Sequence, residues 1–341
     1  MRYYFVIDVF ATGFVYLCIN NNRLLSNNVP QIQGGSLALT PPTQTSQMTV
    51  EGNGLHTHQR TLKKPVPCTG IGVHSGNQVH LTIHPAPINH GIKFMRADLP
   101  GKPVISAHFR NVVDTSLATV IGQDGYILST IEHLMASFYG MGIDNAMVEV
   151  DTHEIPIMDG SAYPFAEAIR TTGIETQGGT RYYFKVKEPI SLSDGDRSVT
   201  VYPADTFQIT SRISFDHPLI NQQSLSLIIT NGIFEREISH ARTFGFYSDY
   251  NQLMQLGLSR GCSFDNVVVI GDKGVMNEDG LRYKDEFVRH KILDCLGDFS
   301  LLGMPLLGHI KTNKSGHALN HAFLKKFLTQ KQSWETHVIS P

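Results

Sequence analysis

Glu175-Thr176-Gln177-Gly178-Gly179-Thr180 separates two parts of the chain that have similar predicted patterns. Polar residues with paired glycines are typical of a linker. In each part, runs of predicted strands are followed by helices, which indicates an α+β arrangement with helices on one face of a sheet. We therefore predict two similar two-layer α/β sandwich domains, residues 60–175 and 181–335, with an active site at their interface.

Hydrophobic periodicity predicts the individual strands and helices. Residues 79–84 alternate apolar and polar side chains, as a half-buried strand does. The other predicted strands are 117–121, 145–150, 182–186, 198–202, 207–215 and 225–229, and the predicted helices are 130–139, 162–171, 283–302 and 318–328.

The composition excludes several classes of protein. Of the 341 residues, 41% are hydrophobic and 17% are charged, as in a globular protein with a core. The net charge of -2, without any block of Lys and Arg, argues against a nucleic-acid binder, although a few placed cations can still hold a small anion. Because Cys18, Cys68, Cys262 and Cys295 form no CxxC pair, we expect free thiols in a reducing cytoplasm.

The first 59 residues differ from the rest. Residues 3–19 are apolar, but Asp8 interrupts them and they are barely long enough to span a bilayer. Residues 20–54 are polar and show no helical or strand period. We predict a poorly ordered extension without stable membrane insertion, in which Met48 is an alternative start.

Residues 287–298 contain a first set of candidate metal ligands. Val288, Ile292 and Leu296 lie on one stripe of a helix that would face the core. His290, Asp294 and Asp298 follow at i, i+4 and i+8, so they stack on a different face. An imidazole and a carboxylate one turn apart can bind one metal ion, but a solvated His–Asp pair has the same spacing.

Residues 129–134 contain a second set. Ser129 and Glu132 have the spacing of a capping box at the start of a helix. Glu132 beside His133 also has the pattern of a catalytic base next to a metal ligand. Together with His290 and Asp294, His133 would complete three ligands with a vacant fourth position, which is typical of catalytic zinc.

Three loops are further candidates. Residues 314–317 (KSGH) precede a predicted helix, where the backbone can approach a ligand and a lysine can meet a phosphate, although an ordinary turn fits equally. Residues 242–246 (RTFGF) place a hydroxyl between a cation and aromatic rings, or form a strand end. Residues 70–76 are glycine-rich but follow no βαβ pattern, so they do not predict a dinucleotide site.

The order of these segments resembles that of the UDP-3-O-acyl-N-acetylglucosamine deacetylases. The resemblance runs from about residue 61 to residue 334 and rests on seven segments, which are 69–76, 129–134, 154–162, 242–246, 277–282, 290–298 and 314–317. The long N-terminal extension departs from the family pattern, and so does a short C-terminal end, but neither contains a proposed site residue.

The resemblance implies roles for individual residues. His133, His290 and Asp294 would hold Zn2+, and Glu132 would be the general base. His317 would be the general acid, oriented by Asp298. The remaining implied site residues are Thr243 at the oxyanion, Lys291 beside the reacting centre, Lys187, Lys314 and Gly316 near the nucleotide, and Phe244 and Phe246 near the sugar and the nucleotide.

The segment 250–269 is implied to form a passage for the acyl chain. Its apolar members are Tyr250, Leu253, Leu256, Phe264, Val267 and Val269. The predicted local pattern is a helix, a tight region around Gly257 and Gly261, and an apolar strand. The same residues would also suit the core of the second domain.

The sequence thus predicts a cytoplasmic, monomeric zinc enzyme of lipid A biosynthesis that hydrolyses the N-acetyl group of UDP-3-O-(3-hydroxyacyl)-N-acetylglucosamine. Two alternatives remain. One is a zinc amidase that acts on another N-acetyl substrate, and the other is a catalytically silent protein that binds a nucleotide sugar.

Overall fold

The first half of the protein is a five-stranded sheet with two helices on one face. The structure, a computed structural model, describes residues 55–339. The sheet order is β2-β3-β9-β4-β5, and only β9 and β4 are parallel neighbours. The elements of this half are β1 (His58–Leu62), β2 (Val66–Ile71), β3 (Gln78–Pro85), β4 (Ile92–Arg96), β5 (Val104–Ser106), β6 (Val112–Asp114), β7 (Val120–Gln123), β8 (Tyr126–Leu128), α1 (Glu132–Met141), β9 (Ala146–Val150) and α2 (Tyr163–Thr172).

The second half repeats this topology. Its sheet contains the order β12-β13-β19-β14-β15, in which only β19 and β14 are parallel neighbours, and β11 and β20 extend it beside β19. These elements are β11 (Tyr182–Val186), β12 (Ile190–Asp194), β13 (Arg197–Tyr202), β14 (Phe207–Ser214), β15 (Gln222–Ile228), α5 (Glu286–Ser300), β19 (Leu306–Asn313), α6 (His317–Thr329) and β20 (Trp334–Val338).

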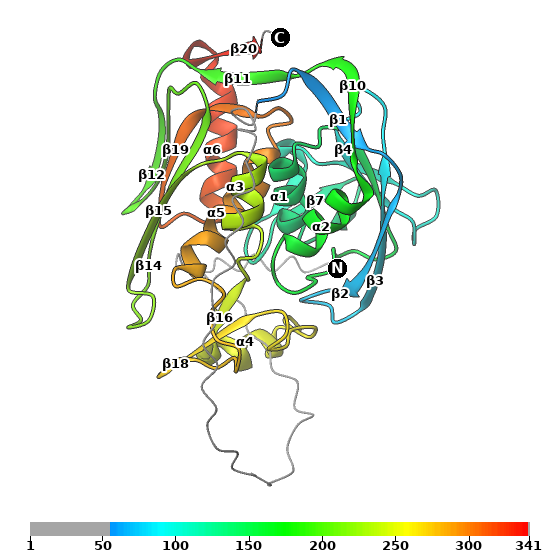
Figure 1. Cartoon of the computed structure of the whole chain (residues 1–341). Helices are drawn as coiled ribbons and strands as arrows, with labels where there is room; N and C mark the ends of the chain where they lie inside the picture. Colours follow the sequence, from blue (N-terminus) through cyan, green and yellow to red (C-terminus); the bar gives the residue numbers. More distant parts are fainter. Residues whose placement is uncertain (1–54, 340–341) are drawn as a thin grey trace, which may run out of the picture.

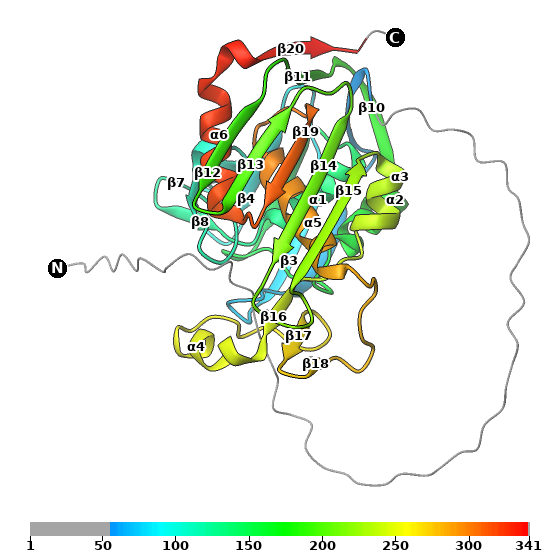
Figure 2. The same ribbon diagram turned by 90° about the vertical axis from the view of Figure 1, so that its left-hand side faces the viewer.

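The central strand of each sheet is framed by equivalent helices. In chain order α1 precedes β9 and α2 follows it, just as α5 precedes β19 and α6 follows it. The helices lie between the two sheets (Figure 1), and Figure 2 shows the second sheet from its outer side. This confirms the predicted α+β class with two similar halves.

An insert between β15 and α5 protrudes at one end of the molecule (Figure 1). Its protruding elements are β16 (Phe244–Phe246), α4 (Tyr250–Gln255), β17 (Val268–Gly271) and β18 (Gly274–Val275), whereas α3 (Asn231–Ile233), earlier in the same segment, lies in the body of the molecule. The predicted helix, glycine-containing turn and apolar strand of residues 250–269 are therefore present.

The predicted linker is wrong. Residues Ile174–Thr180 form strand β10, which pairs antiparallel with β1 at the edge of the molecule. The polar composition suggested a linker, but polar residues also suit this strand because most of its side chains are exposed to solvent. At Gly179 an added Cβ would lie 2.4 Å from the Cγ2 of Ile88, so the Ile88 side chain would have to move.

Several predicted boundaries can be compared directly. The strand 182–186 is confirmed without change, and the helix predicted at 283–302 is shorter, at Glu286–Ser300. Strand β1 begins at His58, two residues before the predicted start of the first domain. The rest of the predicted extension lies outside the described residues, apart from residues 55–57.

The division into domains at 60–175 and 181–335 stays a prediction, because one hydrophobic core continues from the first sheet through the helices into the second.

Two further expectations concern the cysteines and the membrane. Cys68 and Cys295 are free and buried, which confirms the prediction for these two residues. None of the helices within residues 55–339 combines the length and the apolar character that a membrane crossing needs.

Helices α1 and α5 pack against each other at the centre of the molecule. Almost every residue of α1 is buried, as is nearly all of α5. At Gly297 the two backbones approach so closely that an added Cβ would lie 2.1 Å from the backbone oxygen of Glu132. Glycine is therefore required at position 297 for the start of α1 to reach α5.

This contact predicts an unusual response to Gly297→Ala. In an ordinary helix, replacing Gly by Ala stabilises by about 1 kcal/mol. Here the added methyl group must push α1 away, so we expect a net loss of about 1–3 kcal/mol in the free energy of unfolding. Denaturant unfolding measures this change. The control is Gly178→Ala, whose Cβ would meet no atom within 4 Å; a gain in stability for Gly297→Ala would contradict the packing described.

Candidate metal centre

Three side chains from α1 and α5 converge at the start of α1. One ligand atom each from His133, His290 and Asp294 lies within 4.8 Å of the others, and all three residues are buried. The Oδ1 atom of Asp294 is 3.2 Å from Nε2 of His290 and 3.7 Å from Nε2 of His133. The structure therefore brings together the three residues that the sequence predicted as ligands.

The nitrogen atoms of this cluster suit a metal ion. His290 Nδ1 lies 3.0 Å from the carbonyl oxygen of Ala241, so it donates there and leaves the Nε2 lone pair facing the cluster. Nδ1 of His133 is buried without a hydrogen-bond partner among the described residues. Burial, followed by the charge of His290, lowers the pKa of His133 to about 3. A neutral imidazole is the form that binds metals.

Asp294 supplies the negative charge of the cluster. Burial would raise its pKa, but the charges of His290 and Lys291 hold this pKa well below its usual range. Nζ of Lys291 donates to Asp294 Oδ2 at 2.9 Å, so the second carboxylate oxygen is occupied while Oδ1 faces the histidines. An ionised carboxylate with two imidazoles is a typical donor set for a divalent cation.

Glu132 lies beside this cluster but outside it. The predicted capping box is wrong, because no side chain caps α1 and Ser129 instead contacts the hydroxyl of Thr130. The Oε2 atom of Glu132 accepts from the backbone N–H of Thr119 at 3.1 Å. Burial raises the pKa of Glu132 to about 7, although the charge of His317 opposes this shift. A carboxylate with such a pKa can exchange a proton near neutral pH.

His317 is the first residue of α6 and faces Glu132 across the site. Its Nε2 lies 3.9 Å from Glu132 Oε1, and its Nδ1 lies 2.9 Å from Asp298 Oδ2. Burial would lower the pKa of His317, but the charge and hydrogen bond of Asp298 and the charge of Glu132 outweigh it and raise this pKa to about 9. His317 is therefore a cation at neutral pH.

Two residues that the sequence did not single out hold these groups in place. The hydroxyl of Thr119, which precedes β7, donates to Asp298 Oδ1 at 2.6 Å and lies 3.2 Å from His317 Nδ1. The amide of Asn320 donates to Asp298 Oδ2 at 2.8 Å. Asn320 follows His317 by three residues on the predicted helix, so spacing could have found it. Thr119 had no such signal.

Thr243 is buried just before β16. Its backbone N–H donates to Gly160 O, and its carbonyl accepts from Val268 N–H, both at 2.8 Å. The preceding Arg242 is buried and forms an ion pair with Glu286, at 2.9 Å from Nε to Oε1. Thr243 lies in a loop, and the ion pair of Arg242 with Glu286 holds this loop at the start of α5.

The residues predicted near the nucleotide divide into two groups. Lys314 and Gly316 directly precede His317, and Nζ of Lys314 donates to Asp196 Oδ2 at 2.5 Å. Lys187 is not brought to this cluster. Its ammonium lies 3.9 Å from Glu335 Oε2 on edge strand β20, and its backbone N–H donates to Ser333 O.

The predicted aromatic contacts also differ from one another. Phe244 is only 1% exposed and packs against Phe287 and His290, so its ring supports the metal cluster from the core side. Phe246 is half-buried and lies beside Phe215 and His217. Of the two rings, Phe246 is the one that remains accessible to a ligand.

Residues of the predicted acyl passage form a small apolar cluster between the halves. Its buried members are Val73, Ile157, Leu253, Cys262, Val267 and Val269, and half-buried Leu117, Phe246, Tyr250 and Leu258 pack against them. Phe264 is exposed. Since Val269 is fully buried, this arrangement fits either a passage or a core, and the two interpretations remain open.

Comparison with known proteins now bears on this site. A family model described as UDP-3-O-acyl N-acetylglycosamine deacetylase matches residues 59–329. The chain belongs to this family. Among the relatives, UDP-3-O-acyl-N-acetylglucosamine deacetylases from Myxococcus xanthus and Saccharophagus degradans are 48% and 45% identical. The first aligns over 82% of this chain and 88% of its own length, the second over 81% and 92%.

The matched range of the deacetylase family contains every candidate ligand and acid–base residue described above. The resemblance predicted from seven short segments is therefore confirmed across most of the chain.

The cluster predicts how single replacements change metal content. His133→Ala, His290→Ala and Asp294→Ala should each reduce bound metal from one ion per chain to well below that, because each removes one of three donors. Inductively coupled plasma mass spectrometry of the purified variants measures this. His80→Ala, which removes an exposed histidine, should keep its metal. Full metal content in all three ligand variants would contradict the site.

Proposed function

We propose that this chain is a zinc-dependent deacetylase of lipid A biosynthesis. It hydrolyses the N-acetyl group of UDP-3-O-(3-hydroxyacyl)-N-acetylglucosamine, and the products are the free amine and acetate. One observation carries this proposal: the His133–His290–Asp294 cluster lies beside a carboxylate with a raised pKa and a histidine with a raised pKa. The relatives named as deacetylases support the substrate.

Two imidazoles and one carboxylate favour zinc. A zinc ion held by these residues would polarise the acetamide carbonyl and lower the pKa of water. Ferrous iron accepts the same donors, and metal analysis of the enzyme purified from cells distinguishes the two ions.

The protein's own residues move the protons. Glu132 takes a proton from the attacking water as the new C–O bond forms. His317 is protonated at neutral pH and donates its proton to the amine nitrogen as the C–N bond breaks. Thr243 and the Lys291 ammonium would stabilise the oxyanion. Such preorganised donors are typically worth ~3 kcal/mol each in the barrier.

Other chain segments would hold the rest of the substrate. Lys314 and Gly316 at the start of α6 would bind the nucleotide phosphates, and Phe246 would contact the sugar or the base. The apolar cluster around Val269 would take the acyl chain. We further propose that the enzyme acts as a cytoplasmic monomer.

Two alternatives make different predictions. A zinc amidase for another N-acetyl substrate would not require the uridine nucleotide for activity. A silent nucleotide-sugar binder would release no acetate, and it would have no use for the paired Glu132 and His317.

The direct test is incubation of the zinc-loaded enzyme with the acylated UDP-sugar, followed by measurement of acetate. We expect acetate and free amine in equal amounts, and loss of both with a chelator. Glu132→Gln is the matched control, which should keep its metal and lose most of kcat. Acetate release from the same sugar without its nucleotide, at an equal rate, would favour the amidase.

Thr119 offers a sharper test of how the acid and base are held. Thr119→Val keeps the backbone N–H that binds Glu132 but removes the hydroxyl that binds Asp298. We expect kcat to fall about tenfold with unchanged metal content, because the orientation of His317 is loosened. Thr119→Ser restores the hydroxyl and should recover most of the rate. Equal rates for the Val and Ser variants would remove the hydroxyl from the mechanism.

The pH dependence follows from His317. Because its pKa is raised to about 9, the rate should fall as pH rises through this value and the donated proton is lost. Asp298→Asn removes the charge that raises this pKa, so the fall should move to lower pH. The control Asp151→Asn replaces an exposed carboxylate beside His80 and should keep the wild-type profile. A profile of kcat that is flat above pH 9 would contradict His317 as the acid.

Val269→Trp distinguishes an acyl passage from a core. A filled passage should raise KM for long-chain substrates and spare short ones, with metal still bound. A core residue should instead lower the melting temperature and affect all acyl lengths alike. Val199→Trp is the matched control: Val199 is on the buried face of β13, so this variant should show the behaviour of a core residue. Rates on a short and a long acyl substrate, beside the melting temperature, decide the question.

A further inference from the structure

A cavity lies along α1, from Met135 toward the C-terminal end of the helix. It has a volume of about 440 Å³ and is lined by both halves of the protein. Met135, Phe138 and Tyr139 of α1 form its apolar floor, whereas Glu132 and His133 lie in the first turn of the helix. In the second half of the protein, Pro305 lines the cavity. Pro305 lies just before β19, whereas His317 follows the other end of this strand. The volume is within the range of small-molecule sites.

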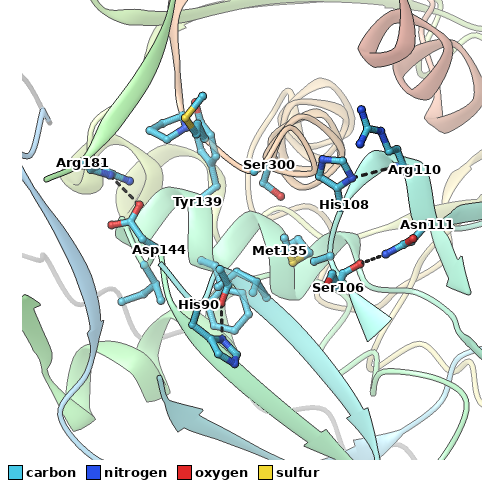
Figure 3. Close-up of a pocket in the computed structure, with 18 residues that line it drawn as sticks. His90, Ser106, His108, Arg110, Asn111, Met135, Tyr139, Asp144, Arg181 and Ser300 are labelled. Atoms are coloured by element: carbon cyan, nitrogen blue, oxygen red, sulfur yellow. Dashed lines mark hydrogen bonds and ion pairs between the residues drawn. The ribbon is translucent and has the colours of Figure 1, made fainter. Parts of the chain in front are cut away.

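The two ends of the cavity carry different polar groups. Figure 3 shows Arg110, His108 and Asn111 together on one side and Arg181 with Asp144 on the other, with Met135 and Tyr139 between them. Arg181 is neutralised, since its Nε donates to Asp144 Oδ1 at 2.8 Å. Arg110 is exposed, its guanidinium carbon lies 5.5 Å from the centre of the Phe109 ring, and it forms no ion pair within residues 55–339. The side near Arg110 is therefore the cationic end.

His108 adds a donor next to Arg110. Its Nδ1 accepts from the backbone N–H of Arg110 at 3.4 Å. Burial, followed by the charge of Arg110, lowers the pKa of His108, so the ring is neutral and its single proton is on Nε2. A guanidinium and an N–H at one mouth of an apolar cavity suit the head of an anion.

The segment that carries these donors is held from three sides. Phe109, between His108 and Arg110, donates its N–H to Leu301 O at 2.9 Å and accepts from His321 Nε2 at 2.8 Å. Asn111 Nδ2 donates to Ser106 O at 2.9 Å. The backbone that carries the donors is thus fixed before a ligand arrives, which lowers the cost of binding.

We propose that this cavity is a second, non-catalytic binding site for an aliphatic carboxylate. The carboxylate head pairs with Arg110 and His108, and the aliphatic chain lies on Met135, Phe138 and Tyr139. A purely apolar ligand would leave the cationic mouth unused, and a dianionic one would bring a second charge toward the apolar floor. The site shares no lining residue with the proposed acyl passage, which lies in the insert.

The test uses octanoate and isothermal titration calorimetry on the full chain. We expect octanoate to bind the wild type, and 1-octanol to bind at least about tenfold more weakly, because it lacks the charge. Arg110→Gln should weaken octanoate about tenfold or more. Arg170→Gln, which removes an exposed arginine on α2, should not.

Two filling variants locate the bound octanoate. Met304→Trp narrows this cavity and should abolish binding, while Val269→Trp in the insert should leave binding unchanged. Melting temperatures confirm that each variant is folded. The proposal is overturned if octanoate does not bind, if octanol binds equally well, or if Val269→Trp abolishes binding and Arg110→Gln does not. The last result would place the probe in the acyl passage.

Discussion

The close approach of α1 and α5 is the constraint on which the site depends. At Gly297 the α5 backbone leaves no room for a Cβ next to the backbone oxygen of Glu132. Since Glu132 and His133 open α1, this contact places them against His290 and Asp294, which lie along α5. The two helices occupy equivalent positions in the two halves, so the repeated topology itself creates the interface between them.

Burial gives this interface its chemistry. Ionised groups are costly to bury unless they are paired, and each charge here has a partner. Lys291 neutralises Asp294, and Asp298 neutralises His317, while His133 stays uncharged. Glu132 has the least compensation, which is why its pKa rises to about 7. A carboxylate and an imidazole, each with a raised pKa, are then left facing each other, with 3.9 Å between Glu132 Oε1 and His317 Nε2.

Much of this arrangement could be predicted from the sequence. The i, i+4 spacing of His290 and Asp294 is a local property of a helix, and so is the pairing of Glu132 with His133. Thr119 was missed because it acts partly through its backbone N–H and meets Asp298 across 179 residues of chain. The strand β10 was missed because an exposed edge strand resembles a linker in composition. The role of Lys187 stays a prediction: its residue type suits a phosphate, and its side chain lies beside β20, 3.9 Å from Glu335 Oε2.

The central claim is that one metal ion sits on His133, His290 and Asp294 while Glu132 stays outside its ligand shell. Anomalous X-ray diffraction from crystals of the zinc-loaded enzyme, measured on both sides of the zinc edge, tests it most directly. We expect one strong peak at about 2.0–2.2 Å from a nitrogen of each histidine and an oxygen of Asp294. A peak bonded to Glu132 in place of any of these three residues, or a peak elsewhere in the protein with none at the cluster, would contradict the account.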